Sequence, residues 1–166
     1  MISEQAFSEF YQQTSATLRN YVARVMGNVT NADDIVQEAY LRMLRRPPPT
    51  DDPRELRAYL FRVASNLITD RWRRQKHEAA ASEMPEALAN SPDAVRQFDM
   101  KRMFHRLRRR DRQLMWLAYV EEASHREIAA TLGLRERSIR VMLSRAREKL
   151  TKLLRGESSP DLGERK

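Results

Sequence analysis

Residues 124–150 read SHREIAATLGLRERSIRVMLSRAREKL, and this stretch predicts a helix-turn-helix. Ser124 followed three residues later by Glu127 forms a capping box, which marks the start of a helix. Gly133 then supplies the tight turn that the motif needs. The buried side of this first helix consists of Ile128, Ala129 and Leu132.

The second helix of the motif has one apolar stripe and one polar face. At about 100° per residue, the stripe consists of Ile139, Met142, Leu143, Ala146, Leu150 and Leu153. The opposite face centres on Arg137, Val141, Ser144 and Glu148, with Arg140 and Arg145 at its flanks. A basic face at the start of such a helix suits the major groove of DNA, where an exposed Val141 can pack on a thymine methyl group. The alternative is a two-helix hairpin whose basic face is only solvated.

Helical periodicity also dominates the rest of the chain, and no stretch alternates with the period of a strand. We expect an all-α fold of two small helical domains, 1–75 and 93–155, joined by a flexible linker at 76–92 and followed by a disordered tail at 156–166. Asn31, and Asp52 followed by Pro53, predict helix starts. The expected helices span about 3–26, 31–46, 52–75, 92–108, 111–121, 124–132 and 136–155.

The helix expected within 52–75 has three distinct faces. Its core stripe consists of Leu56, Leu60, Val63, Ala64 and Leu67. A polar face consists of Arg62, Asn66, Thr69 and Arg73, and a third stripe of Phe61, Ile68 and Trp72. One interpretation is that the polar face is only solvated and that the third stripe widens the core stripe. Contact of the aromatic and basic side chains with opened DNA bases is the other.

The composition excludes several classes of protein. The absence of Cys excludes disulfides, zinc knuckles and thiol nucleophiles, and favours a reducing cytoplasm. The four glycines cannot form a phosphate-binding loop, and no run approaches the roughly 18 apolar residues of a membrane span. The histidines show no metal-ligand spacing; they are His77, His105 and His125. We therefore expect no catalysis, no cofactor, no metal and no small-molecule substrate.

The charge distribution points to a polyanionic partner. The net charge is +8, and its basic excess lies in two blocks, 41–78 and 96–155, which are separated by an acidic segment at 79–95. Two separated basic blocks predict two contacts with nucleic acid. A basic surface that is merely solvated is the alternative.

Three motifs in this order resemble one bacterial family. They are DDIVQEAYLRML (33–44), LRAYLFRVASNLITDRWRR (56–74), and SHREIAATLG (124–133) followed by a basic helix. Over about residues 3–155 the chain closely resembles the extracytoplasmic-function (ECF) RNA polymerase sigma factors of the sigma-70 family, particularly the iron-starvation and iron-citrate type. The resemblance implies a subunit that binds core RNA polymerase, directs it to promoters and initiates transcription, with a link to iron uptake.

The resemblance also assigns residues to three surfaces. The residues that match positions contacting the clamp helices of the largest polymerase subunit are Asp34, Gln37, Glu38, Leu41 and Arg42; the flap of the second largest subunit is a further implied partner. The loop 46–54 resembles one that captures a flipped base of the −10 element, and the implied −10 contacts are Arg54, Arg62, Asn66, Thr69 and Arg73. The implied −35 contacts are Arg135, Arg137, Arg140, Val141, Ser144 and Arg145.

Two departures and one alternative accompany this resemblance. Family members commonly have Gly where Glu122 stands, and often Ser and Arg where Val141 and Met142 stand.

The resemblance further implies an anti-sigma partner, membrane-linked in relatives of this type. The alternative function is a helix-turn-helix regulator that works without core polymerase, as a dimer. The acidic DDIVQE segment favours the sigma factor, because a plain repressor does not need it.

Overall fold

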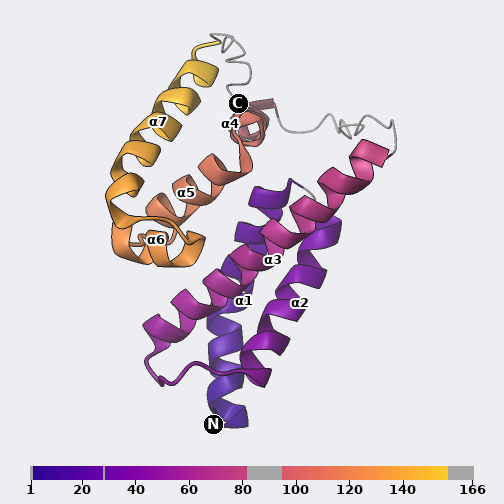
Figure 1. Cartoon of the computed structure of the whole chain (residues 1–166), viewed down its shortest axis with the longest axis vertical. Coiled ribbons are helices and arrows are strands. Elements are labelled where there is room, and N and C mark those ends of the chain that lie inside the picture. The colour runs from indigo at the N-terminus through magenta and orange to yellow at the C-terminus, as the bar shows by residue number, and fades with distance from the viewer. Residues whose placement is uncertain (1, 28, 82–94, 157–166) are drawn as a thin grey trace.

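The computed structural model describes residues 2–27, 29–81 and 95–156, and every regular element in these ranges is a helix. One bundle consists of α1 (Glu4–Met26), α2 (Val29–Arg45) and α3 (Pro53–Ala81). The other consists of α4 (Val95–Arg106), α5 (Arg109–Tyr119), α6 (His125–Leu132) and α7 (Glu136–Leu154), with α6 and α7 forming the helix-turn-helix (Figure 1). The prediction of an all-α fold with this motif in its second half is confirmed.

Several helix ends follow local chemistry, and of these the start at Asp52 was predicted. Ser3 caps α1, because its Oγ accepts a hydrogen bond from the amide of Ala6 at 3.2 Å. Asp52 caps α3 in the same way, accepting from the amide of Arg54 at 2.9 Å. α2 ends just before the three prolines that begin at Pro47.

Boundaries of four helices differ from the prediction by two residues or more; α4, for example, ends at Arg106 rather than at 108. α2 begins at Val29, so Asn31 lies inside the helix rather than at its N-cap. A residue that favours the N-cap position indicates a helix start only where the residues before it are not themselves helical. α3 continues to Ala81, so 76–81 is helix and not linker, in keeping with the high helix propensity of Glu and Ala. α5 spans Arg109–Tyr119 rather than 111–121. The rest of the predicted linker, the start predicted at residue 92 and residues 157–166 lie outside the described residues.

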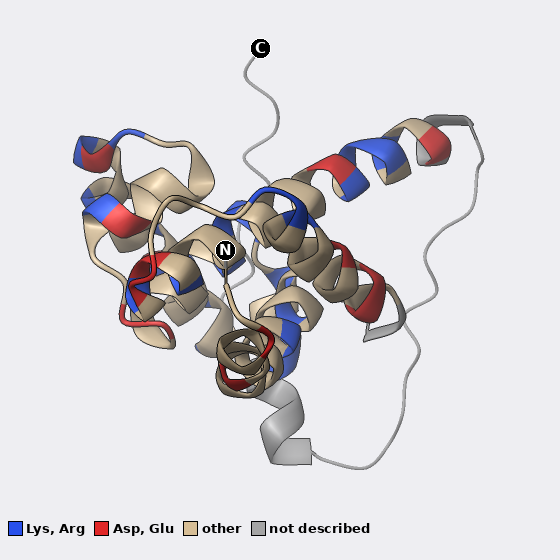
Figure 2. Ribbon diagram, turned by 90° about the horizontal axis from the view of Figure 1, so that it is seen from below, with Lys and Arg blue, Asp and Glu red and all other residues tan. Residues whose placement is uncertain are grey.

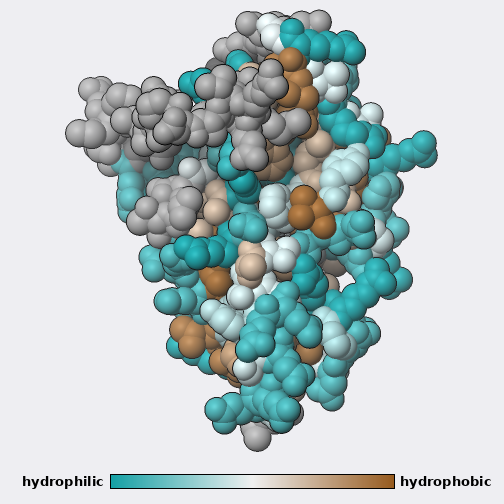
Figure 3. Space-filling view, turned by 180° about the vertical axis from the view of Figure 1, so that it is seen from behind, coloured by the Kyte–Doolittle hydropathy of each residue, from teal (hydrophilic) through white to brown (hydrophobic). Residues whose placement is uncertain are grey.

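The two bundles share one hydrophobic core. α5 packs against α1, and α6 packs against α3. Of the third stripe of α3, Phe61 and Ile68 are buried, within the same apolar cluster as Leu114 and Leu117 of α5. Packing between the halves therefore accounts for most of this stripe. On the face shown in Figure 3, hydrophobic side chains form only small, separate patches on a largely hydrophilic surface.

A buried polar node lies where α1, α3 and α5 meet. Ser65 Oγ donates to the carbonyl of Phe61 at 2.7 Å, so the hydroxyl of Tyr21 donates to Ser65 at 2.8 Å. The side-chain amide of Gln113 donates to the Tyr21 hydroxyl at 3.4 Å. Tyr21 and Gln113 are almost fully buried, and burial raises the pKa of Tyr21 to about 12. This node joins the halves through a neutral phenol.

The turn between α5 and α6 has a strained backbone. Glu122 has φ 53°, in the left-handed region that favours glycine, and its side chain is exposed. The amide of the next residue, Ala123, donates to the carbonyl of Leu117 at 2.9 Å and closes the turn. The chain thus has a glutamate at a position whose conformation favours glycine.

We predict that Tyr21 loses its proton near pH 12 instead of near pH 10. Because its pKa is raised on folding, the contribution of Tyr21 to stability is complete below pH 10 and is lost as the pH rises through 12. Difference absorbance of tyrosinate during an alkaline titration measures this, and Tyr21→Phe identifies the late phenol. Tyr21→Phe should also lower the free energy of unfolding by about 1 to 3 kcal/mol, because Gln113 loses its acceptor. A Tyr21 that titrates with the exposed tyrosines contradicts the buried node.

We predict that Glu122→Gly stabilises the chain by about 0.5 to 1 kcal/mol, because glycine adopts a positive φ without strain. Glu148→Gly is the matched control: this exposed residue lies within α7, where glycine should cost about 0.5 to 1 kcal/mol. Urea denaturation of the three chains measures both effects. A loss of stability in both variants would show that the turn gains nothing from glycine.

Candidate polymerase and nucleic-acid interface

The exposed face of α2 carries the five residues predicted to contact polymerase. Asp34, Gln37, Leu41 and Arg42 are exposed and Glu38 is partly buried, whereas the opposite face packs in the core through Ala32, Ile35, Ala39 and Met43. The acidic residues of this helix lie in its first ten residues but not in its first turn, and Figure 2 distinguishes acidic from basic residues by colour. The helix therefore presents these side chains together, as the sequence predicted.

The charged side chains on α2 differ in their internal partners. Glu38 accepts a hydrogen bond from Arg42 Nε at 2.8 Å, and this bond lowers the pKa of Glu38. Asp33 pairs with Arg19 of α1 at 3.0 Å. Asp34 has no ion pair within the described part of the chain, so its carboxylate is available to a partner.

Two apolar side chains near this face were missed by the sequence analysis. Leu44 is exposed one turn beyond Leu41, and Tyr11 of α1 is exposed beside Tyr40, with ring centroids 4.8 Å apart. The sequence could have indicated that Leu44 is exposed, because this residue lies outside the core stripe of α2. Tyr11 could not be found in this way, because its position beside α2 depends on helix packing.

The polar face of α3 brings together some of the predicted −10 residues. Arg62, Asn66 and Arg73 are exposed on one side of the helix. Thr69 lies on the same side but is partly buried, and its Oγ1 accepts from Arg109 Nη1 of α5 at 2.8 Å. The guanidinium of Arg109 also lies 5.2 Å from the ring centre of Trp72, which is 41% exposed. The second half of the chain thus covers one end of this face.

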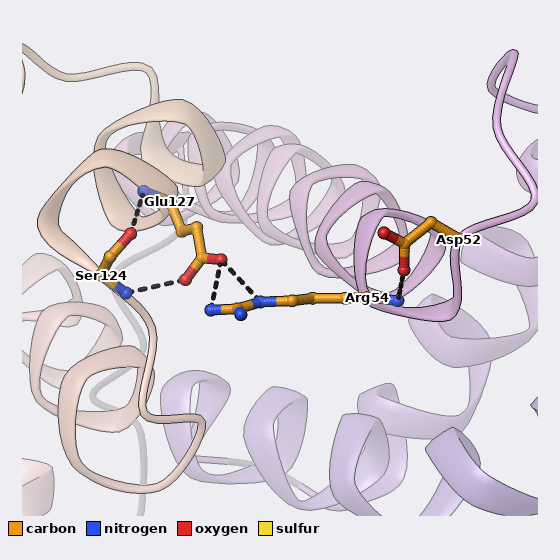
Figure 4. Close-up of polar contacts among 4 residues, drawn as sticks. All are labelled: Asp52, Arg54, Ser124 and Glu127. Carbon is orange, nitrogen blue, oxygen red and sulfur yellow. Dashed lines mark hydrogen bonds and ion pairs between the residues drawn. The ribbon is translucent and has the colours of Figure 1, made fainter.

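Arg54, the first predicted −10 residue, is also engaged by the second half. It lies at the start of α3, and its Nη2 is 3.0 Å from Glu127 Oε1 of α6 (Figure 4). One turn further along α3, Arg57 Nη2 is 2.8 Å from Glu121 Oε2. The sequence analysis placed Glu127 only in a capping box and assigned no role to Arg57 or Glu121.

Hydrogen bonds hold the loop 46–54 against α3 and also connect residues within the loop. The hydroxyl of Tyr59 donates to the carbonyl of Arg46 at 2.9 Å, and the amide of Thr50 donates to the carbonyl of Pro48 at 2.8 Å. The amide of Asp52 donates to Thr50 Oγ1 at 3.2 Å. The loop therefore presents its prolines in a defined conformation next to Arg54.

The helix-turn-helix has the local geometry that the sequence predicted. Ser124 Oγ accepts from the amide of Glu127 at 3.1 Å, while Glu127 Oε2 accepts from the amide of Ser124 at 2.8 Å. The hydrogen bond from the backbone amide of Ser124 lowers the pKa of the Glu127 carboxyl, and the nearby charge of Arg54 lowers it further. Gly133 ends α6 with φ 67°.

All of the predicted −35 residues are exposed on the outer side of the motif: Arg135, Arg137, Arg140, Val141, Ser144 and Arg145. Val141 is 50% exposed, although it is apolar. Ile139 and Leu143, on the other side of α7, are buried. Two cations further along are used internally: Arg147 donates to the hydroxyl of Tyr119 at 2.8 Å, and Lys149 pairs with the buried Asp111 at 2.9 Å. The exposed basic face of α7 thus begins at its N-terminal end.

The described residues contain no group of three or more His, Asp or Glu side chains placed to hold a metal ion. None of the described helices combines the length and hydropathy that crossing a membrane requires. The chemistry available on these surfaces is charge, hydrogen bonding and apolar contact.

Comparisons with known proteins match both halves. A family model described as sigma-70 region 2 matches residues 10–78, and one described as sigma-70 region 4 matches residues 97–150. The ECF RNA polymerase sigma factor SigW of Bacillus subtilis is 28% identical over 92% of this chain and 90% of its own. The ECF RNA polymerase sigma factor SigL of Mycobacterium tuberculosis is 30% identical, over 80% of each chain.

A solved structure has a similar fold. The sigma factor RpoE from Bartonella quintana, in complex with the anti-sigma factor NepR, superposes with a TM-score of 0.77. The match covers 90% of this chain and 96% of that one, at 23% sequence identity. The similarity extends over both bundles and their arrangement.

Proposed function

This chain belongs to the ECF RNA polymerase sigma factors of the sigma-70 family, and from that membership we propose that it directs bacterial core RNA polymerase to specific promoters. One observation carries the proposal: a single chain presents an acidic-apolar face on α2, a polar face on α3 and a basic face on α7. The first suits a basic protein partner, and the other two suit DNA. The chain acts as a specificity subunit and catalyses nothing itself.

In this proposal α2 docks on the clamp helices of the largest polymerase subunit through Asp34, Gln37, Glu38, Leu41 and Arg42. The second half contacts the flap of the second largest subunit. Asp34 leads the α2 contact, because its carboxylate is exposed and has no ion pair within the described ranges. Leu41, which is 45% exposed, supplies apolar area beside it.

The −10 element is contacted by loop 46–54 and by Arg54, Arg62, Asn66, Thr69 and Arg73. The −35 element is contacted by Arg135, Arg137, Arg140, Val141, Ser144 and Arg145, all exposed on the helix-turn-helix. The N-terminal half of such a helix meets base edges, and its sides meet phosphates. Arg137, Arg140 and Val141 are therefore the base-reading residues in this proposal.

An anti-sigma factor regulates the chain in this proposal. The support is the similar fold of a sigma factor solved in complex with its anti-sigma factor. Membrane linkage of this partner and a role in iron uptake rest on the resemblance of three motifs to the iron-starvation type. The site of action is the cytoplasm, where core polymerase and promoter DNA meet.

Run-off transcription with purified core polymerase tests the function. We predict defined transcripts from the cognate promoter only when the chain is present. Asp34→Arg should weaken binding to core polymerase about tenfold, because a rim charge is reversed. Glu9→Arg on α1 is the matched control, since Glu9 is also acidic, exposed and without an ion pair in the described part of the chain. DNA binding without promoter-directed transcripts would instead indicate a regulator that works without polymerase.

For the −35 element we predict two kinds of loss. Arg140→Ala should cost about 1 to 3 kcal/mol on the cognate sequence and relax specificity at one position, and Val141→Ser should relax discrimination of thymine. Arg145→Ala, at the side of the helix, should weaken all sequences alike and reduce the salt dependence of binding. Titrations against a panel of −35 variants at two salt concentrations measure these effects. Equal losses on every sequence for all three variants would mean that the helix contacts only the backbone.

A further inference from the structure

Glu121, in the turn that follows α5, has a buried oxygen without a partner. Its side chain is only 7% exposed. Oε2 accepts from Arg57 of α3, through Nε at 2.9 Å and through Nη2 at 2.8 Å. Oε1 is buried and has no hydrogen-bond partner among the described residues. Because a buried acceptor that stays unpaired is costly, this oxygen favours a molecule that brings a donor to it.

Glu121 lines a small cavity between α3 and the turn before α6, with a volume of about 80 Å³. Part of the wall is apolar and consists of Ala58, Phe61, Leu117 and Ala123. Two exposed residues, Arg54 and Glu122, also line the cavity, so a small molecule can reach it from the surface. A cavity of about 150 Å³ can hold benzene, so roughly half that volume suits about four non-hydrogen atoms.

The charged side chains around the cavity carry one more negative charge than positive charges. They are Arg54, Arg57, Glu121, Glu122 and Glu127. Arg57 is paired with Glu121, and Arg54 extends to Glu127 at 3.0 Å (Figure 4). Glu122 is exposed and has no ion pair within the described ranges. The surplus negative charge therefore lies with Glu122, and it favours a monovalent cation in the cavity.

The unpaired oxygen of Glu121 restricts the chemistry of such a cation. A carboxylate oxygen only accepts hydrogen bonds, so a fully ionised anion or a cation without N–H groups cannot pair with it. A primary ammonium group supplies both the positive charge and the N–H donors, and hydrogen bonds between charged groups are the stronger ones. A short alkyl chain on the ammonium suits the apolar part of the wall.

We propose that this cavity binds a small primary alkylammonium ion of about four non-hydrogen atoms. The ammonium group donates to Glu121 Oε1, and the alkyl chain packs on Phe61 and Leu117. So small a ligand has little binding free energy available, and the expected dissociation constant is about 1 mM. The site goes beyond the proposed function, because it involves neither polymerase nor DNA.

Three probes of similar size test the chemistry of the site in the full parent chain. Propylammonium has the charge, the N–H donors and the alkyl chain. 1-Propanol has the chain and a donor without the charge, and tetramethylammonium has the charge without a donor. Each probe is titrated at constant ionic strength, and nuclear magnetic resonance follows the backbone amides of Ala58 and Ala123, which line the cavity.

We expect propylammonium to shift both amide signals saturably, and the other two probes to bind at least about tenfold more weakly. The absence of a saturable shift at about 50 mM propylammonium overturns the proposal. Equal binding of 1-propanol also overturns it, because apolar contact alone would then fill the cavity. Equal binding of tetramethylammonium does the same, because charge alone would then account for the shifts.

Two variants and one control place the ligand. Glu121→Gln keeps the side-chain volume and should weaken propylammonium binding at least about tenfold. Ala58→Leu fills the cavity without changing its charge and should abolish the saturable shift at Ala123. Glu9→Gln removes the same charge from an exposed site on α1 and should change the affinity by less than about twofold. Circular dichroism verifies the helical content, and unchanged affinity in either of the first two variants overturns the proposal.

Thermal unfolding gives a second measurement. A ligand that binds only the folded chain raises the unfolding midpoint, by about 5 °C at about twenty times its dissociation constant. The same concentration of tetramethylammonium should leave the midpoint unchanged. An equal rise with both cations overturns the proposal. Run-off transcription tests the proposed function separately, so failure of the ligand site leaves that function standing.

Discussion

The buried hydroxyl of Tyr21 is the interaction on which the arrangement of this molecule depends. It joins α1 to Ser65 of α3 and to Gln113 of α5, at the point where the two halves share their core. A buried polar group without partners is costly, so these three side chains specify one relative placement of the helices. That placement then decides which faces remain exposed. The α2 face and the outer face of α7 are accessible, whereas parts of the α3 face are covered by the second half.

Local features of the sequence predicted most of the fold. The capping box of Ser124 and Glu127, the turn at Gly133 and the helical stripe of α7 are encoded within a few residues of each other, and all are present. The predicted start of α2 at Asn31 was wrong, because the helix already begins at Val29. Asn is a favourable N-cap residue, but its presence does not prevent a helix from starting before it. The end of α3 was wrong because 76–81 has no apolar stripe, although its residues favour helix. Both errors lie at helix ends, where no apolar stripe in the sequence indicates the boundary.

Contacts between distant residues could not be predicted. Phe61 and Ile68 formed a stripe with no assigned partner, and only the packing of the second half shows what covers them. The pairs of Arg57 with Glu121 and of Arg54 with Glu127 join residues more than 60 positions apart, and no periodicity marks them. The predicted polymerase and −35 residues do share exposed faces, because helical spacing determines this. Their roles in binding remain predictions.

The distance between the two halves tests the account most directly. The chain has no Cys, so Ser8→Cys on α1 and Thr151→Cys on α7, both exposed, introduce unique sites for spin labels. Pulsed electron spin resonance should give one narrow distance distribution for the free chain. A broad distribution would contradict the shared core as the feature that fixes the arrangement of the two halves.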